Sequence, residues 1–240
     1  KNVMTVANLD ADDNIANSSS RGPAHDGRIK PDISAKGTQV FSTIGGYTYD
    51  VYTGTSMSCP GVSGTMAVLY SAYQDINGSQ PEGGLMKAIA LNTADDLGNP
   101  GPDFIYGWGR INARKAFSVI ENTNYTSATL SNGDSTTIYV SVPAGVSQAK
   151  IMIYWTDPEA SINASTALIN DLDMTITTPS LSVLQPLVLD PTPNATTLAS
   201  PAVPGEDHLN NVEQIVIDSP EAGTYAVKIK GYDVPQGPQK

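Results

Sequence analysis

The sequence is poor in cysteine, in basic residues and in long apolar runs, and each shortage excludes something. Among 240 residues Cys59 is the only cysteine, so no disulfide can form within the chain. No apolar run reaches the roughly 18 residues of a membrane-spanning helix, and we expect no membrane association. The 13 basic residues face 24 acidic ones, a net charge of −11, which argues against nucleic acid because its phosphates attract lysine and arginine.

Histidine is scarce as well, with one residue in "GPAHDGR" and one in "GEDHLNN". Both segments are polar and turn-like, so we expect His25 and His208 to be solvated loop residues. The shortage bears on the stretch Tyr52–Tyr70, "YTGTSMSCPGVSGTMAVLY", in which Ser56 has the setting of a nucleophile. A nucleophilic serine normally needs a base and an orienting carboxylate, and the chain offers no evident base.

We expect Ser56 to lie at a turn from a strand into a helix. Its backbone N–H would then sit at a helix N-terminus, where the dipole favours a developing oxyanion. Gly54 permits close backbone approach before it, and Pro60 is placed in the first turn, where missing N–H groups cost least. The next residues are small, so the helix can run close-packed through a core: Gly61, Ser63, Gly64 and Ala67.

Strand and helix patterns alternate over the first 122 residues, which is typical of an α/β fold. The pair Gly45–Gly46 predicts the turn between two of the strands. The expected elements are strands at 2–8, 39–44 and 47–54 and helices at 56–73, 83–95 and 111–122.

After Asn122 apolar and polar residues alternate, with turn residues about every ten positions. This spacing predicts an antiparallel sandwich or barrel. We therefore predict two domains, residues 1–122 and 123–240. The strand candidates are "STTIYVSVPA", "AKIMIYWTDP", "ALINDLDMTITTP", "VEQIVIDSP" and "GTYAVKIKGYDVP".

Three motifs carry a resemblance to a known family. "GTSMSCPGVSG" is similar to the serine motif of the subtilisin-like serine proteases (subtilases), and "SSSRGPAHDGRIKPDISAKG" and "YGWGRINARKAF" resemble segments that flank it. The resemblance covers residues 1 to about 122. It implies the C-terminal portion of a subtilisin-type parallel-sheet domain, from a secreted endopeptidase that cleaves polypeptides through an acyl-enzyme on Ser56. It also implies that the Thr55 hydroxyl supports the oxyanion, although local packing of a strand-end threonine explains Thr55 equally well.

In that family an aspartate, a histidine and an oxyanion asparagine precede the serine, and motifs such as His-Gly-Thr do not occur here. Asp32 is not that aspartate and is expected to cap or anchor a turn. Because the chain opens at Lys1 in a strand-like segment, we expect a processed or truncated product. It should be inactive alone and associate with the missing N-terminal half or with itself. The alternatives are a catalytically silent structural or binding module, or a half that acts only with a separate N-terminal polypeptide.

The segment from about 124 resembles the C-terminal jelly-roll or β-barrel domain of some alkaline bacterial subtilases. It is more distantly similar to the P domain of kexin-like proprotein convertases. The resemblance rests on "WTDPEA", "LINDLDMTIT", "NNVEQIVI" and "SPEAGTYAVKIKGYDVP". It implies an all-β jelly-roll or sandwich domain that stabilises the protease part, and in some relatives such domains carry calcium.

Acidic residues of this segment are candidate calcium ligands, because calcium takes six to eight oxygens. Asp171 and Asp173 lie on the same side of a strand, since side chains alternate. Asp157 and Asp207 could approach them from neighbouring loops. A solvated strand end, or hydrogen bonds to turn amides, explains the same residues without a metal.

Overall fold

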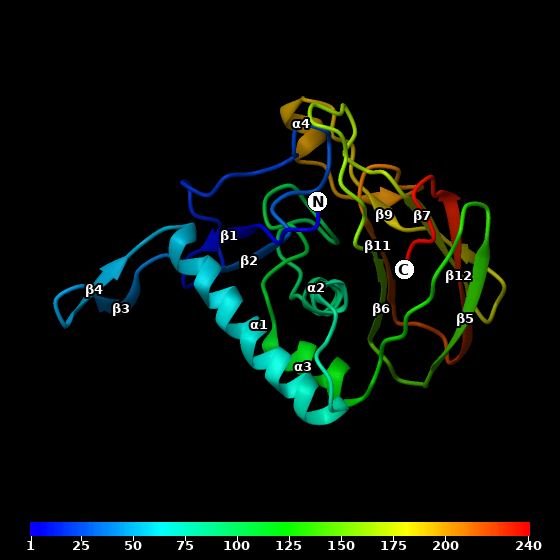
Figure 1. Ribbon diagram of the computed structural model, residues 1–240, viewed down its shortest axis with the longest axis horizontal. Helices are drawn as coiled ribbons and strands as arrows, with labels where there is room; N and C mark the ends of the chain where they lie inside the picture. Colours follow the sequence, from blue (N-terminus) through cyan, green and yellow to red (C-terminus); the bar gives the residue numbers. More distant parts are fainter.

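The computed structural model describes residues 1–240, and its first half is arranged around one long helix, α1 (Thr55–Asn77). The strands β1 (Val6–Leu9) and β2 (Ile33–Lys36) pair in parallel, and both contact α1. The helix α3 (Ala113–Glu121) packs against α1 as well. The helix α2 (Gly83–Asn92) lies between α1 and the strands of the second half (Figure 1).

The ends of α1 follow from backbone chemistry. Gly78 adopts a left-handed φ of 69° and its N–H donates to the Gln74 carbonyl, which closes the helix. The helix begins at Thr55, one residue earlier than expected. Pro60 lies five residues after this start, which is the second turn and not the first. Proline at this position removes the N–H that would otherwise bond the Ser56 carbonyl.

One face of α1 is open. Ser58, Val62 and Leu69 are its buried residues, while Val68 keeps 69% of its surface exposed. Beside Gly61 and Gly64 no atom lies within 4 Å of the place a Cβ would take. The sequence predicts a helix close-packed through a core, but within residues 1–240 nothing packs on this outer face.

A hairpin of β3 (Val40–Ile44) and β4 (Thr48–Tyr52) leads into α1 and projects from the body of the structure (Figure 1, far left). Its turn contains Gly46 with a φ of 77°, as the Gly45–Gly46 pair predicts. Phe41 and Tyr49 stack with ring centroids 5.4 Å apart, and both remain exposed. The predicted hairpin is therefore confirmed, and it stands clear of the other elements.

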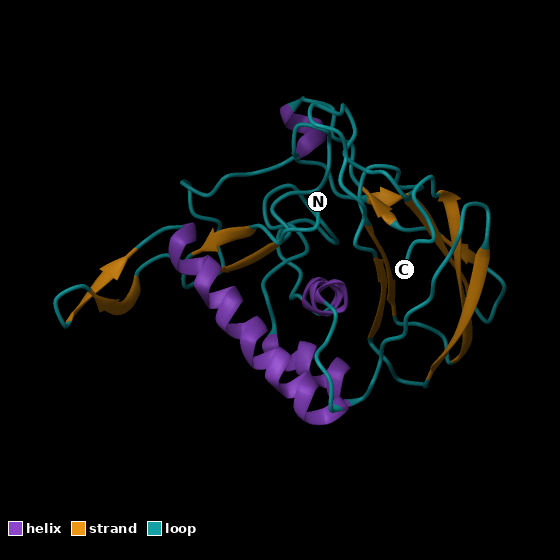
Figure 2. Cartoon of the chain, viewed as in Figure 1, coloured by secondary structure: helices purple, strands orange, loops and turns teal.

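The second half is built mainly of strands in antiparallel pairs (Figure 2). One sheet has the order β5–β12–β7–β8, β11 pairs with β6, and β10 pairs with β9. Trp155, Tyr225 and Ile215 belong to the core that these sheets enclose. The bounds are β5 (Ser135–Val142), β6 (Gln148–Tyr154), β7 (Asp171–Thr177), β8 (Val183–Leu184), β9 (Leu187–Val188), α4 (Ala195–Leu198), β10 (Val203–Pro204), β11 (Val212–Asp218) and β12 (Gly223–Asp233).

The antiparallel pairing predicted after Asn122 is confirmed, but the jelly-roll topology is not. Sheets of four and two strands, with a further short pair, do not establish the two-sheet arrangement that a jelly roll requires. Short strands and long connections between β7 and β11 are the physical reason, because they leave few residues to extend the second sheet.

The two halves of the chain pack against each other through a common apolar core. The Asn92 amide donates to the Lys150 carbonyl over 3.1 Å, and the Gln214 amide donates to Asn92 Oδ1 over 2.9 Å, so β6 and β11 lie against α2. One buried cluster joins Leu91 of the first half to Val212 of the second. Secondary structure changes after α3 as expected, but the division into domains 1–122 and 123–240 stays a prediction.

Asp32 anchors the start of β2 to the start of β1. Its Oδ2 accepts from the Thr5 backbone N–H over 2.7 Å and also binds Lys30, and its Oδ1 lies 2.8 Å from Lys87 Nζ. The Lys87 ammonium also donates to the Val3 carbonyl. Burial works to raise the pKa of Asp32, but Lys87 and Lys30 outweigh it and hold the pKa below its ordinary value.

Replacement of this carboxylate should destabilise the fold in a pH-dependent way. Asp32→Asn leaves the Lys87 ammonium buried without a counter-ion, and we expect a loss of about 3–5 kcal/mol in the free energy of unfolding at neutral pH. Because the folded pKa of Asp32 is lowered, its contribution is present above the ordinary value of 3.8 and is lost as pH falls through the folded pKa. Urea unfolding at pH 7 and at acidic pH measures both effects.

The matched control is Asp12→Asn, since Asp12 is exposed. It should leave unfolding within about 0.5 kcal/mol of the wild type. Equal losses in the two variants would contradict the anchoring role of Asp32.

Candidate functional site

Ser56 follows Thr55, the first residue of α1, and its side chain is exposed. Its backbone N–H has no acceptor within the chain, whereas the next two N–H groups, of Met57 and Ser58, point to the Gly54 carbonyl. A free N–H at the positive end of a helix is a donor for a developing oxyanion. The serine hydroxyl and this N–H therefore face solvent together at one end of α1.

The turn before Ser56 is held by a close backbone contact. The Gly54 N–H donates to the Gly37 carbonyl over 2.9 Å. A Cβ on Gly37 would meet the Gly54 carbonyl at 2.5 Å and the Ser58 nitrogen at 2.8 Å. Only glycine allows this approach, so the loop after β2 fixes where α1 begins and where Ser56 points.

Thr55 lies beside Ser56 and is exposed, so the structure leaves its hydroxyl accessible. Its carbonyl accepts a hydrogen bond from Ser58 Oγ at 3.2 Å, which belongs to the first turn of the helix. This contact involves the backbone of Thr55 alone. Both interpretations of its side chain, oxyanion support and local packing, remain open.

Neither histidine hydrogen-bonds Ser56. His25 is exposed in its loop, as expected. His208 is also an exposed loop residue, with 39% of its side-chain surface accessible, but its Nδ1 lies 2.7 Å from Asp171 Oδ2 and its ring stacks on Tyr232 with centroids 4.5 Å apart. The sequence did not predict these two contacts, because both partners are remote from His208 in the chain.

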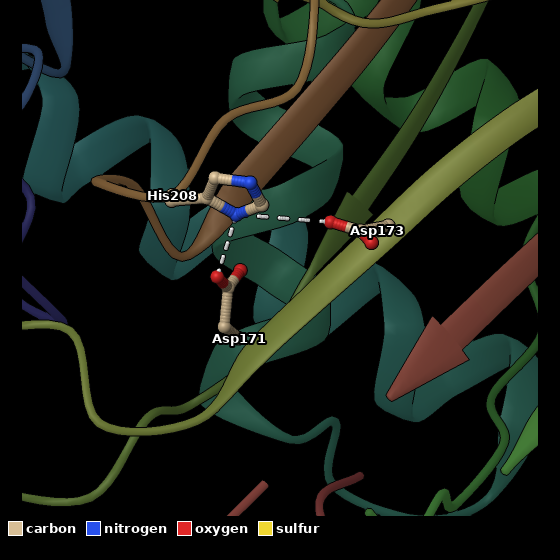
Figure 3. Close-up of side chains that lie close together, drawn as sticks. All are labelled: Asp171, Asp173 and His208. Carbon is tan, nitrogen blue, oxygen red and sulfur yellow. Dashed lines mark hydrogen bonds and ion pairs between the residues drawn. The ribbon is translucent and has the colours of Figure 1, made fainter. Parts of the chain in front are cut away.

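Asp171, Asp173 and His208 form a cluster, which we call the Asp–His cluster (Figure 3). His208 Nδ1 lies 3.9 Å from Asp173 Oδ1, and one ligand atom from each residue lies within 4.8 Å of the others. The two aspartates come from the same side of β7, as the alternation of side chains predicts, and His208 comes from the loop before β11. No local pattern in the sequence places His208 here.

The structure does not bring the other two candidate calcium ligands into this cluster. Asp157 accepts from the Asn170 N–H at 2.7 Å and from the Ile169 N–H at 2.9 Å, and it pairs with Lys1. Asp207 accepts from the N–H groups of Leu209 and Asn210 and from the Asn210 amide. Their oxygens serve as loop anchors.

The carboxyl groups around the cluster carry raised pKa values. Burial raises the pKa of Asp171 to about 6, against the opposing effect of His208, and burial also raises the pKa of Asp173 and Asp207. Burial raises the pKa of Glu213 on β11 well above its ordinary value. Burial therefore favours the neutral, protonated form of these carboxyl groups more than in an exposed aspartate or glutamate.

Calcium fits the Asp–His cluster poorly. Calcium prefers six to eight oxygen ligands, and the cluster supplies two carboxylates and an imidazole nitrogen. Calcium binding by Asp157, Asp171, Asp173 and Asp207 stays a prediction, and the donor set does not favour it.

A groove of about 420 Å³ lies between α1, the segment that contains β1, and the start of α2. Val6 of β1, Val62 and Met66 of α1 and Lys87 of α2 line it, and most of its lining is apolar. No strand pairs with the other edge of β1, but that edge is partly occupied, because the Ala16 N–H donates to the Asn8 carbonyl and the Asn8 N–H donates to Ser19 Oγ. The groove lies on a different side of α1 from its open face with Gly61 and Gly64.

Comparisons with known proteins agree on the first half of the chain. Residues 1–109 match the model of the subtilase family, Peptidase_S8. The serine protease/ABC transporter B family protein tagD of Dictyostelium discoideum is 26% identical over 95% of this chain, which spans 17% of that protein. The minor extracellular protease Vpr of Bacillus subtilis (strain 168) is 36% identical over 51% of this chain and 16% of its own length. Subtilisin DY of Bacillus licheniformis is 34% identical over 48% of this chain and 36% of its own length.

Among solved structures, the patellamide maturation protease PatA is 24% identical, with a TM-score of 0.43 over 50% of this chain and 44% of that one. The family model and the relatives, not this structure, show that the segment containing Ser56 is similar to subtilisin-like serine proteases. Because the chain spans a minor part of these relatives, their complete activities do not pass to it by similarity alone.

The contact before Ser56 gives a direct test of how the site is positioned. Gly37→Ala should destabilise the fold by about 1–3 kcal/mol, because the added methyl group must displace the Gly54 carbonyl and the first turn of α1. Gly45→Ala is the control, since no atom lies within 4 Å of its Cβ position. Thermal unfolding measures both, and a Gly37 variant as stable as the Gly45 variant would show that the contact does not hold the turn.

Proposed function

We propose that this chain is the nucleophile-bearing part of a serine endopeptidase that cleaves polypeptides. The observation that carries the proposal is the exposed Ser56 at the N-terminus of α1, beside its own free backbone N–H. Ser56 Oγ would attack the scissile carbonyl and form an acyl-enzyme, and the N–H would stabilise the oxyanion. The Thr55 hydroxyl, exposed at the same helix end, is proposed as a second support for that oxyanion.

The base must come from outside residues 1–240, because neither histidine of the chain contacts Ser56. We propose that the remaining part of the catalytic domain supplies the histidine, its carboxylate partner and the oxyanion asparagine. This part would be a preceding segment or a separate polypeptide. It would cover the groove between α1 and β1 and the open face of α1, both of which favour an apolar partner.

Residues 1–240 alone should then show no ordinary protease activity. Without a base, a catalytic serine loses most of its rate enhancement, of the order of 10⁶-fold in a well-studied case. The same observation supports the second candidate, a catalytically silent structural or binding module. Self-association through the open face of α1 is a further consequence, because uncovered apolar surface favours contact.

Residues 123–240 are proposed to be a jelly-roll or sandwich domain that stabilises the protease part. The support is the contact of β6 and β11 with α2, which buries apolar surface of both halves.

Secretion is proposed as the location of the whole protein. The support is that a relative carries the name minor extracellular protease. No helix of this structure combines the length and the apolar character that a bilayer crossing demands.

A fluorophosphonate probe tests the assignment in the full-length protein. We expect covalent labelling of the wild type, loss of labelling in Ser56→Ala, and no labelling of residues 1–240 alone. Ser71→Ala is the matched control, because Ser71 is an exposed serine farther along the same helix, and it should be labelled like the wild type.

Labelling that persists in Ser56→Ala would overturn the nucleophile assignment. Ser56-dependent hydrolysis of casein by residues 1–240 alone, at the rate of the full-length protein, would overturn the proposal that the base lies elsewhere. A full-length protein that is never labelled would favour the silent module.

A further inference from the structure

The Asp–His cluster holds buried oxygen atoms that the protein leaves without partners. Asp171 Oδ1, Asp173 Oδ1 and Glu213 Oε1 are buried and accept no hydrogen bond. Leaving a buried carboxylate oxygen unpaired costs free energy, more for a charged group than for a neutral one. Three such atoms in one region point to a ligand that would satisfy them.

Glu213 is independent evidence for such a ligand. It is only 1% exposed, and its Oε2 accepts from the Met174 N–H of β7 over 2.7 Å while Oε1 has no partner. The charged residues that line a cavity of about 210 Å³ are Glu213, Asp173 and Glu206 together with Lys228 and Lys230. A fully buried glutamate and an aspartate of the cluster therefore face one hollow.

The nearby lysine, Lys230, forms no ion pair with the carboxyl groups of this region. Lys230 lies opposite Asp173 across the β7–β12 ladder, where an ion pair would be expected. Its ammonium instead lies over the Tyr232 ring, 5.3 Å from the centroid, and it forms no ion pair within 4.0 Å. Lys230 thus acts on Asp173 only through its charge at longer range, which works to lower the pKa of that carboxyl group.

The spacing of the cluster suits a small ion with four ligands. Two ligand atoms about 2.05 Å from a tetrahedral ion lie about 3.3 Å apart. The separations from His208 Nδ1, 2.7 Å to Asp171 and 3.9 Å to Asp173, bracket that value. Figure 3 shows the same ring nitrogen directed at both carboxylates, so small side-chain movements would bring the three atoms around one ion.

The second nitrogen of His208 has the setting of a metal-binding histidine. Glu206 Oε2 lies 3.8 Å from His208 Nε2, on the side of the ring away from the two aspartates. Metal-bound histidines commonly direct their other N–H toward a carboxylate, which fixes the tautomer. Stacking on Tyr232, with 23° between the ring planes, limits rotation of the imidazole.

We propose that Asp171, Asp173 and His208 bind a divalent transition-metal ion of the Zn²⁺ class, with the Glu213 carboxyl group beside Asp173. Imidazole nitrogen with carboxylate oxygen is a donor set that suits Zn²⁺ and its neighbours, whereas calcium selects oxygen alone. The two aspartates lie on β7, and His208 lies in the loop that leads into β11. Because β7 and β11 belong to different sheets, the ion would link these two sheets. The site is separate from Ser56 and does not depend on the proposed protease function.

Metal binding to the full chain tests the proposal. Metal-free protein is titrated with Co²⁺ and with Zn²⁺, and Co²⁺ binding is followed by visible absorption. We expect one ion per chain, displacement of Co²⁺ by Zn²⁺, and no displacement by millimolar Ca²⁺. X-ray absorption of the Zn²⁺-loaded wild type should show imidazole and carboxylate ligands.

Variants assign the ligands. His208→Ala should weaken Zn²⁺ binding by at least about 100-fold, and Glu206→Gln, whose side chain is 66% exposed, by about 10-fold through loss of the carboxylate that faces Nε2. His25→Ala and Cys59→Ser are controls, because both residues are exposed and lie outside the cluster, and they should bind Zn²⁺ like the wild type.

The visible and X-ray absorption measurements use the wild type. They therefore test the proposal even if the His208 variant fails to fold. The proposal is overturned if the wild type binds no Zn²⁺, if His208→Ala binds it as tightly as the wild type, or if Ca²⁺ displaces Co²⁺ at equal concentration. The first result would assign His208 and Asp171 to a simple ion pair, and the last would assign the cluster to calcium.

Discussion

The contact between Gly37 and Gly54 is the constraint on which the rest of the site depends. Because Gly37 has no side chain, the loop after β2 approaches the turn before α1 closely enough for the Gly54 N–H to reach the Gly37 carbonyl. That contact sets the start of α1 against the β1–β2 sheet. The position of Ser56, and the free N–H beside its hydroxyl, follow from where the helix begins.

The open face of α1 supports the proposal that the base for Ser56 lies outside residues 1–240. Helix α1 buries one narrow face on β1, β2 and α3, and α2 separates it from the sheets of the second half (Figure 1). Small residues on its other face, such as Gly61 and Gly64, suit close packing against another layer. In the proposed account, the layer that packs on this face also carries the groups that activate Ser56. One part of the protein would then both cover α1 and supply the catalytic partners of the serine.

Local chemistry made much of this predictable from sequence. The glycine pair of the β3–β4 turn, the apolar spacing of α2 and α3 and the alternation that pairs Asp171 with Asp173 all depend on near neighbours. Contacts between remote residues were not predictable in the same way. His208 meets Asp171 from the loop before β11, and Asp157 meets Lys1 over a separation of 156 positions. Pro60 lies in the second turn of α1 because the helix begins five residues before it, at Thr55.

The central claim is that Ser56 is a nucleophile activated from outside residues 1–240. Mass spectrometric mapping of the full-length protein after treatment with a serine-directed fluorophosphonate tests it most directly. The account predicts one adduct, on the peptide that contains Ser56, and none when residues 1–240 are treated alone. An adduct on any other serine, or equal modification of the isolated chain, would contradict it.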